Sequence, residues 1–195
     1  WGVAELARHR AVMPQHPALD FPFLVREVVA LGRSPYRADR SRDTLLVNEA
    51  MSFFDIGHLA DRMYTTLSGG ERQRVHLARV WAQVNQPDAD HARYLLLDEP
   101  TSALDLKHQR SLLNLLRDSV ATGQLGVVAA LHDLNSAAQY ADQLIMLNRG
   151  EVVAAGSPQQ VLTSGVVEEI YQVPVEFIRY QPGEKQVIAI PGGEP

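Results

Sequence analysis

Three short apolar runs, each ended by polar residues, constrain the fold of this chain more than any other feature. They read "YLLLDEP" from Tyr94, "GVVAALHD" from Gly126 and "QLIMLNRG" from Gln143. Continuous runs of this length are typical of strands that are buried on both faces of a parallel sheet. Amphipathic patterns separate them, and helices are expected over residues 107–119 and 135–140. Strands that alternate with helices predict right-handed βαβ units and therefore an α/β fold.

The residues before these runs are predicted to be mostly helical. "AELARHRAVMPQ" predicts a short helical turn and then a strand that ends near Gln15. Two apolar helix faces follow, one made of Leu24, Val28, Val29 and Leu31, the other of Leu45, Leu46, Ala50, Phe53 and Phe54. The charged stretch "GRSPYRADRSRD" between them predicts an exposed loop, and a helix is expected from about Glu71 to Gln83. Near the C-terminus, "LIMLNRGEVVAAG" predicts a hairpin that turns at 148–150, and the tail alternates weakly, as an edge hairpin does.

Composition excludes several classes of protein. The net charge of −5 argues against a general nucleic-acid binder, which usually has a basic face. The chain has no cysteine, so no disulfide framework holds it together. No apolar run reaches the roughly 18–20 residues that a membrane-spanning helix needs. A chain of 195 residues can nevertheless bury a substantial core without such supports.

Two adjacent carboxylates, Asp98 and Glu99, follow the first apolar run. Ligands of open α/β sheets bind outside the carboxyl ends of the strands, so this pair is expected at a ligand site. Consecutive strand residues point to opposite sides, which predicts separate tasks for the two acids. In phosphoryl transfer, one such carboxylate holds Mg²⁺ and a second polarises the attacking water. A surface turn remains an alternative interpretation of the pair.

The stretch "LSGGERQRVHLARV" places Ser68, Gly69 and Gly70 in front of an amphipathic run. Ser68 and Glu71 match a capping box, which explains the serine but neither glycine. Glycine resists helical order, and a bare backbone at a helix N-terminus exposes N–H groups that bind anions. The two interpretations, a simple cap and a phosphate site, both remain open from these residues alone.

His132 ends the second apolar run and precedes a helix. Its strand is expected to neighbour the acidic one, so its imidazole could donate a hydrogen bond to a phosphate oxygen. A structural role is the ordinary interpretation of a lone histidine at a strand end. That ordinary interpretation also suits the other histidines, which are His9, His16, His58, His76, His91 and His108.

These motifs together resemble a known family. "LSGGERQ", "LLLDEPTSALD", the "LHD" histidine and the "MPQ" glutamine resemble, in order and spacing, the nucleotide-binding domain of ATP-binding-cassette (ABC) transporters. The resemblance implies a P-loop NTPase (RecA-like) core with a mostly parallel sheet and an inserted helical subdomain. It divides the chain into residues 1–15 (core strand and Q-loop), 16–81 (helical subdomain with the signature), 82–157 (catalytic core) and 158–195 (C-terminal tail).

The same resemblance implies roles for individual residues toward ATP and Mg²⁺. Gln15 becomes the Q-loop residue that touches Mg²⁺ and the attacking water, and Asp98 the Walker B magnesium ligand. Glu99 becomes the general base, and His132 the switch histidine that contacts the γ-phosphate. The remaining residues implied in nucleotide binding are the signature residues and one D-loop residue, namely Ser68, Gly69, Gly70, Gln73 and Asp105. The signature residues would bind ATP that the opposite subunit holds.

Finer features resemble the ATPases of bacterial importers for iron-siderophores, vitamin B12 and haem. "HPALDFPF" and "ALGRSPY" most resemble the haemin importers. This implies a homodimer on a transmembrane permease dimer at the cytoplasmic face of the bacterial inner membrane. A periplasmic haem-binding protein would be an indirect partner, and no nucleic-acid partner is expected.

One element of the family is missing from the sequence. The phosphate loop G-x-x-x-x-G-K-[ST] is absent, because the only lysines, Lys107 and Lys185, follow Leu106 and Glu184. The family's adenine-stacking aromatic, which lies upstream, is missing too. We therefore expect the chain to be inactive alone, as a truncation, a gene model begun too late or a natural loss. Two alternatives are a non-hydrolysing scaffold subunit and a cassette ATPase of DNA repair or translation, the latter disfavoured because basic tracts and coiled-coil heptads are lacking.

Overall fold

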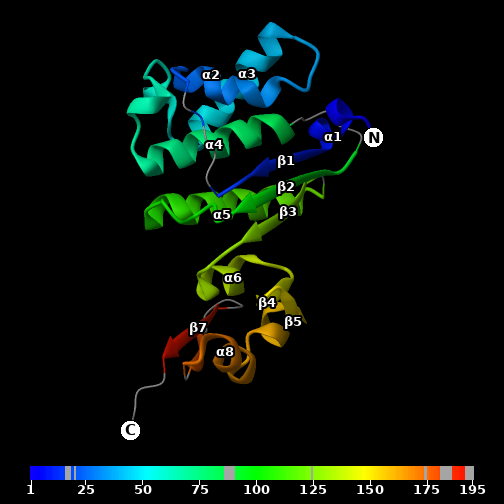
Figure 1. Ribbon diagram of the computed structural model, residues 1–195, viewed down its shortest axis with the longest axis vertical. Coiled ribbons are helices and arrows are strands. Elements are labelled where there is room, and N and C mark those ends of the chain that lie inside the picture. The colour runs from blue at the N-terminus through cyan, green and yellow to red at the C-terminus, as the bar shows by residue number, and fades with distance from the viewer. Residues whose placement is uncertain are drawn as a thin grey trace. The chain divides into compact units, whose positions relative to one another are not determined.

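The fold is described from a computed structural model, shown in Figure 1. The structure describes residues 1–15, 19, 21–85, 91–123, 125–173, 175–180 and 186–191. The chain divides into two compact units, Trp1–Ala130 and Leu131–Pro195, which are treated separately below.

The first unit is built on a three-stranded sheet. Its strands are β1 (Arg10–Met13), β2 (Arg93–Asp98) and β3 (Leu125–Ala130), in the order β1-β2-β3. Both pairings are parallel, with Ala11 opposite Leu95 and Leu95 opposite Val127. The predicted parallel sheet is confirmed, including the prediction that the strand before His132 neighbours the acidic strand.

The helices of the first unit lie beside this sheet (Figure 1). They are α1 (Val3–His9), α2 (Val25–Ala30), α3 (Arg40–Phe53), α4 (Gly69–Val84) and α5 (Leu106–Ala121), with short 3₁₀ turns η1 (Leu31–Arg33), η2 (Gly57–Leu59) and η3 (Tyr64–Thr66). Helices α2 and α3 pack on α4, so these three form a helical layer beside the strands. The predicted α/β fold with a helical subdomain is therefore confirmed.

The two faces of the sheet differ in burial. The closed face carries the side chains that join one buried cluster with Leu77 of α4 and with Leu112 and Leu116 of α5; its residues are Ala11, Met13, Leu95, Leu97, Val127 and Ala129. The open face carries Val12, Tyr94, Leu96, Gly126 and Val128, of which Val12, Tyr94 and Val128 are exposed. Burial on both faces was predicted, and that prediction is wrong for the described residues, because both helices contribute to the same face.

The stretch "GRSPYRADRSRD" is not simply an exposed loop. Arg33 is buried, and its guanidinium donates to Ala82 O at 2.8 Å and to Asp43 Oδ1 at 2.8 Å. Asp39 caps α3 by accepting from the Arg42 amide, so the helix already begins at Arg40. A charged residue is buried here because both of its partners satisfy it.

The prediction of which residues form the apolar face of α3 is partly wrong. Leu46, Ala50 and Phe54 are buried, but Leu45 and Phe53 are exposed. The buried positions of the helix also include Val47 and Met51. These residues recur at the three- and four-residue spacing that places side chains on one side of a helix, and Leu45 lies off that side.

Among its described residues, the second unit contains short helices and four strands, which pair as two hairpins. They are α6 (Leu134–Tyr140), β4 (Leu144–Asn148), β5 (Glu151–Gly156), α7 (Pro158–Val161), α8 (Ser164–Tyr171), β6 (Val175–Tyr180) and β7 (Gln186–Pro191). The predicted hairpin is confirmed: β4 pairs antiparallel with β5, and Arg149 and Gly150 turn it with φ of 50° and 83°. Positive φ at both central residues suits a tight hairpin turn. The third apolar run therefore forms part of an antiparallel hairpin, where a strand of a parallel sheet was predicted.

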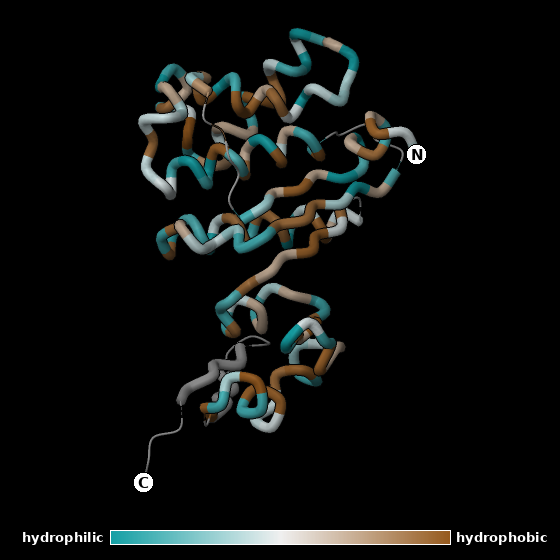
Figure 2. The backbone as a smooth tube through the Cα atoms, in the orientation of Figure 1, coloured by the Kyte–Doolittle hydropathy of each residue, from teal (hydrophilic) through white to brown (hydrophobic). Residues whose placement is uncertain are grey.

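The C-terminal tail also forms a hairpin, because β6 pairs antiparallel with β7. In Figure 2 the middle of the strands of the first unit is coloured as hydrophobic, whereas the exposed turns are largely hydrophilic. Within the residues described above, no helix is both long enough and apolar enough to cross a membrane.

Candidate functional site

Three of the predicted site residues lie at one edge of the sheet. Gln15 follows β1 by two residues, Asp98 ends β2, and Glu99 comes directly after it. Because β1 and β2 are parallel and Met13 lies opposite Leu97, both strands end at the same edge. This is the edge where open α/β sheets bind ligands. Residues 16–18 and 20, which follow Gln15, lie outside the described residues.

Glu99 has an unusual backbone conformation. Its φ is 47°, which few residues other than glycine adopt. Proline at the next position, Pro100, restricts the backbone of Glu99 further. Such conformations cost on the order of 1–3 kcal/mol and persist where the surroundings enforce them. The strand alternation used to predict the direction of Glu99 therefore stops at Asp98, and the following turn sets that direction instead.

The turn after β2 is held by a dense set of hydrogen bonds. The carbonyl oxygen of Glu99 accepts from Gln73 Nε2 at 2.9 Å, from Ser102 Oγ at 3.1 Å and from the Ser102 amide at 3.3 Å. Gln109 of α5 donates to Thr101 O at 3.1 Å and to Leu104 O at 2.9 Å. These hydrogen bonds hold the turn in place and so stabilise the unusual backbone conformation of Glu99.

The signature helix α4 begins with the predicted capping box. The Glu71 amide bonds to Ser68 Oγ at 3.4 Å, and Glu71 Oε2 accepts from both the Ser68 amide and the Ser68 hydroxyl at 2.8 Å. These two donors, first the amide and then the hydroxyl, lower the pKa of the Glu71 carboxyl. The cap interpretation of Ser68 and Glu71 is confirmed.

The two glycines of the signature lie in different surroundings. A Cβ added to Gly70 would lie 2.7 Å from the carbonyl oxygen of Ala103, whereas a Cβ on Gly69 would meet no atom within 4 Å. Gly70 is therefore required by the close approach of two backbones within this chain. Sequence reasoning gave both glycines the same task, and only the structure separates them.

Gln73 and Asp105 both make contacts inside the chain. Gln73 lies one turn after Gly70, and its Oε1 accepts from the Ala103 amide at 3.0 Å while its Nε2 donates to Glu99 O. Asp105 caps α5 by accepting from the His108 amide at 2.9 Å and from His108 Nδ1 at 2.8 Å. These donors, with the amide first, lower the pKa of the Asp105 carboxyl. The roles of Gln73 and Asp105 toward nucleotide remain predictions.

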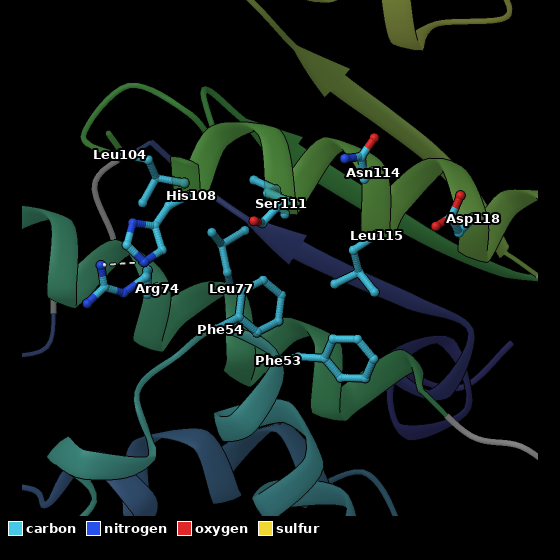
Figure 3. Close-up of a pocket in the computed structure, with 11 residues that line it drawn as sticks. Phe53, Phe54, Arg74, Leu77, Leu104, His108, Ser111, Asn114, Leu115 and Asp118 are labelled. Carbon is cyan, nitrogen blue, oxygen red and sulfur yellow. Dashed lines mark hydrogen bonds between the residues drawn. The ribbon is translucent and has the colours of Figure 1, made fainter. Parts of the chain in front are cut away.

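His108 makes structural contacts, in line with the ordinary interpretation given to it, although the sequence did not identify all of its partners. Besides Asp105, its ring meets Arg74 of α4, with Nη1 at 3.4 Å from Nε2, as Figure 3 shows. The carboxylate of Asp55 lies 3.7 Å from the same Nε2. The only sequence signal was the Asp105–His108 spacing, which suits a helix cap.

A cavity of about 390 Å³ opens beside this contact, between α4, α5 and the end of α3 (Figure 3). Its lining includes Phe53, Phe54 and Leu115, and it includes the polar residues Asn114 and Asp118. None of the predicted site residues lines it.

His132 is the second residue of the second unit and follows the end of β3 by two residues. It is exposed and precedes Asp133, which caps α6 by accepting from the amides of Asn135 at 3.2 Å and Ser136 at 2.9 Å. The strand before His132, β3, pairs with β2 as predicted. The role of His132 toward phosphate remains a prediction.

The residues at the sheet edge fit magnesium only in company with other ligands. Within the described part of the chain, no group of three or more His, Asp or Glu side chains could hold a metal by itself. Asp98 and Gln15 each offer an oxygen ligand at that edge. Mg²⁺ commonly takes one or two protein ligands and completes its shell with waters and substrate phosphates. The donor set therefore suits a magnesium–nucleotide complex rather than a metal held only by protein.

Comparison with known proteins gives consistent results. The sequence model of the family described as "ABC transporter" matches residues 2–102. A "Hemin import ATP-binding protein HmuV" of Shewanella denitrificans is 48% identical over 181 residues, which cover 93% of this chain and 70% of that protein. The protein of the same description from Vibrio parahaemolyticus is 46% identical over 171 residues, or 88% of this chain. The chain spans only 65% of the length of this second relative.

A solved structure is similar over nearly the whole chain. It is an inward-facing conformation of a transporter assigned to the metal-chelate type, with a TM-score of 0.77 and 29% sequence identity. The match covers 95% of this chain and 73% of the other.

Proposed function

The chain belongs to the ABC transporter family, and from this we propose that it is the ATP-binding subunit of a bacterial importer. The proposed task is to couple ATP hydrolysis to the uptake of haemin, or of a related iron chelate, across the inner membrane. Support for the substrate comes from the relatives described as hemin import proteins. Support for the fold of a P-loop NTPase comes from the similar metal-chelate type transporter.

One observation carries the proposed chemistry: Gln15, Asp98 and Glu99 lie at or just beyond the ends of two neighbouring parallel strands. In the proposal, Asp98 and Gln15 hold Mg²⁺, which would neutralise charge on the phosphates of bound ATP. Glu99 accepts a hydrogen bond from the attacking water and takes its proton. His132 donates a hydrogen bond to the γ-phosphate.

The start of α4 supplies the second part of the proposed site. Ser68, Gly69 and Gly70 would bind the γ-phosphate of ATP held by a second copy of the chain, at the positive end of the helix dipole. The open space at Gly69 supports this role. The proposed assembly is a homodimer on a permease dimer at the cytoplasmic face of the membrane, with a periplasmic haem-binding protein as an indirect partner.

The test requires the phosphate loop, because the sequence contains no Gly-Lys pair and the 195-residue chain is expected not to hydrolyse ATP alone. We would join a segment that contains a G-x-x-x-x-G-K-[ST] loop ahead of Trp1 and measure ATPase activity; this fusion is called the parent chain. Glu99→Gln should lower kcat by at least about 100-fold, because the water loses its base. Glu49→Gln, on the exposed side of α3, is the matched control. Equal activity of the parent and Glu99→Gln would contradict the role of Glu99.

A second candidate is a non-hydrolysing scaffold that lends its signature to a competent partner. The missing Gly-Lys pair and the formed cap at Ser68 favour it. The 195-residue chain, mixed with the intact Shewanella denitrificans relative, would then raise the ATPase activity of that relative. No stimulation at any ratio would argue against the scaffold.

A further inference from the structure

We propose that Gln73 is a positioning residue that holds the backbone of Glu99, and so aims the carboxylate that acts as general base. This inference rests on the proposed function and goes beyond it. It gives Gln73 a task inside its own subunit, through the turn that follows β2, rather than a contact with nucleotide.

The geometry of the Gln73 side chain carries the inference. Its primary amide lies between the first and the fifth residue of the turn, with Nε2 donating to Glu99 O at 2.9 Å and Oε1 accepting from the Ala103 amide at 3.0 Å. In a regular helical turn, the amide of the fifth residue bonds directly to the carbonyl of the first. The Gln73 amide is therefore inserted into this turn and satisfies both groups while keeping them apart.

The insertion affects Glu99 directly. Rotation about the N–Cα bond, which changes φ, moves the carbonyl group and the side chain of a residue together, so holding the carbonyl resists a change of φ and of the side-chain direction. Glu99 adopts a φ of 47°, and relaxation to an ordinary negative φ would turn its side chain away from its present direction. Ser102 also bonds to the same carbonyl, but it belongs to the turn and moves with it. Among the donors to this oxygen that are described above, Gln73 is the one that comes from α4, outside the turn.

The helix that carries Gln73 is itself well anchored. Gly70, one turn earlier, allows the main chain of α4 to approach the carbonyl of Ala103. The buried residues of α4 include Val75, Leu77 and Ala78, which belong to the core cluster with Leu95 and Leu97 of β2. Gln73 therefore reaches the turn from a rigid element, which is what a positioning residue requires.

The test compares three single variants. Gln73→Met keeps the approximate length of the side chain and removes both hydrogen bonds. Gln73→Glu keeps an acceptor for the Ala103 amide but places a carboxylate oxygen, which cannot donate, beside Glu99 O. Gln83→Met is the matched control, because Gln83 lies on the same helix and also bonds two main-chain groups, Ala7 O at 2.7 Å and Arg10 O at 3.2 Å, away from the turn.

Two measurements are made. Amide hydrogen exchange on the 195-residue chain reads the bond to Ala103: its amide should lose protection in Gln73→Met and keep it in Gln73→Glu and Gln83→Met. The kcat of ATP hydrolysis by the parent chain reports whether the Glu99 carboxylate is correctly positioned. Misplacement of a catalytic group by about 1 Å can cost about 100-fold, so Gln73→Met should lower kcat by roughly 10- to 100-fold. The KM for ATP should stay within about threefold, since nucleotide binding is not changed.

The pH profile separates a positioning role from a loss of stability. In Gln73→Glu, protonation of the introduced carboxyl restores a donor to Glu99 O, so kcat relative to the parent chain should recover as the pH falls; in Gln73→Met it should not. If Gln73→Met has the same kcat as Gln83→Met, Gln73 is only a structural contact and the proposal is wrong. A parent chain without ATPase activity contradicts the proposed function, whereas an active parent whose Gln73→Met variant keeps its kcat contradicts only the role of Gln73.

Discussion

The open and closed faces of the three-stranded sheet carry similar side chains in different surroundings. Leu95 on the closed face is 1% exposed, whereas Tyr94 and Val128 on the open face are 49% and 67% exposed. Apolar composition is therefore a poor guide to burial in this sheet. The decisive difference is that α4 and α5 both contribute to the cluster on the closed face. Parallel sheets of α/β proteins are commonly covered on both faces, which makes the open face the exception.

The sharpest test uses two adjacent leucines of β2 that point to opposite faces. Leu95→Ala should lower the free energy of unfolding by about 3 kcal/mol, because it leaves a cavity in the packed cluster. Leu96→Ala makes the same chemical change on the open face, where Leu96 is only half-buried, and should cost about 1 kcal/mol or less. Urea unfolding of both variants gives the comparison. Equal losses would show that the faces do not differ in packing.

Two glycines test whether the atoms around an added methyl group can move aside. A Cβ on Gly32 of η1 would lie 2.2 Å from the carbonyl oxygen of Arg79 in α4, and a backbone cannot move aside easily. Gly32→Ala should therefore destabilise by about 2 kcal/mol. On the open face, a Cβ on Gly126 would lie 2.9 Å from Cδ1 of Tyr94, a half-exposed ring that can rotate. Gly126→Ala should change the free energy of unfolding by less than about 0.5 kcal/mol. Thermal unfolding of both variants measures the two losses of stability. A large loss of stability in Gly126→Ala would contradict the expectation that the Tyr94 ring moves aside.

The helical layer on α4 contains a buried titratable group, His76. Its Nε2 lies 2.7 Å from the Tyr64 hydroxyl, and burial, together with the charge of Arg79, lowers the pKa of His76 from 6.5 to about 4. The unfolded chain therefore binds a proton near pH 6.5 that the folded chain does not, and the stability falls as the pH decreases. Between pH 7 and pH 5.5 the loss should be roughly 1 kcal/mol.

The control for this pH dependence uses two histidine substitutions and urea unfolding at both pH values. His76→Gln removes the titrating group, so its stability should change less than that of the unmodified chain. His58→Gln, at an exposed position of η2, should leave the pH dependence unchanged. If His76→Gln loses as much stability as the unmodified chain, another group causes the effect.

The smallest expected effect comes from two valines of β3. Val127→Thr buries a hydroxyl on the closed face and should cost about 1 kcal/mol. Val128→Thr makes the same change at an exposed position and should stay within about 0.5 kcal/mol. Chemical unfolding of the pair measures the difference. A loss in Val128→Thr as large as in Val127→Thr would indicate that the open face is covered in solution.

Much of this fold was predictable because its patterns are local. The apolar runs at Tyr94 and Gly126 predicted β2 and β3, and the spacing of Ser68 and Glu71 predicted the start of α4. The sequence also predicted that one strand ends near Gln15 and that another ends at Asp98. In each case the signal depends on residues a few positions apart, where periodicity and capping chemistry determine the structure.

The contacts that the sequence did not predict join residues far apart in the chain. The burial of Arg33 depends on Ala82, and the bonds of Gln73 depend on Glu99 and Ala103. Glutamine on an amphipathic helix carries no pattern that identifies such a partner. The conformation of Glu99 was equally hidden, because its φ depends on a turn that distant residues hold together.

The contact between Gly70 and Ala103 has a mechanical consequence. Since no side chain separates the two backbones, no compressible layer lies between the start of α4 and the turn after β2. A displacement of the start of α4 toward the turn would therefore bring the helix backbone directly against the Ala103 carbonyl. A single added methyl group at Gly70 would hold the two segments apart. The second glycine of the motif thus sets the distance between two closely packed backbones, whereas the first leaves open space beside the helix start.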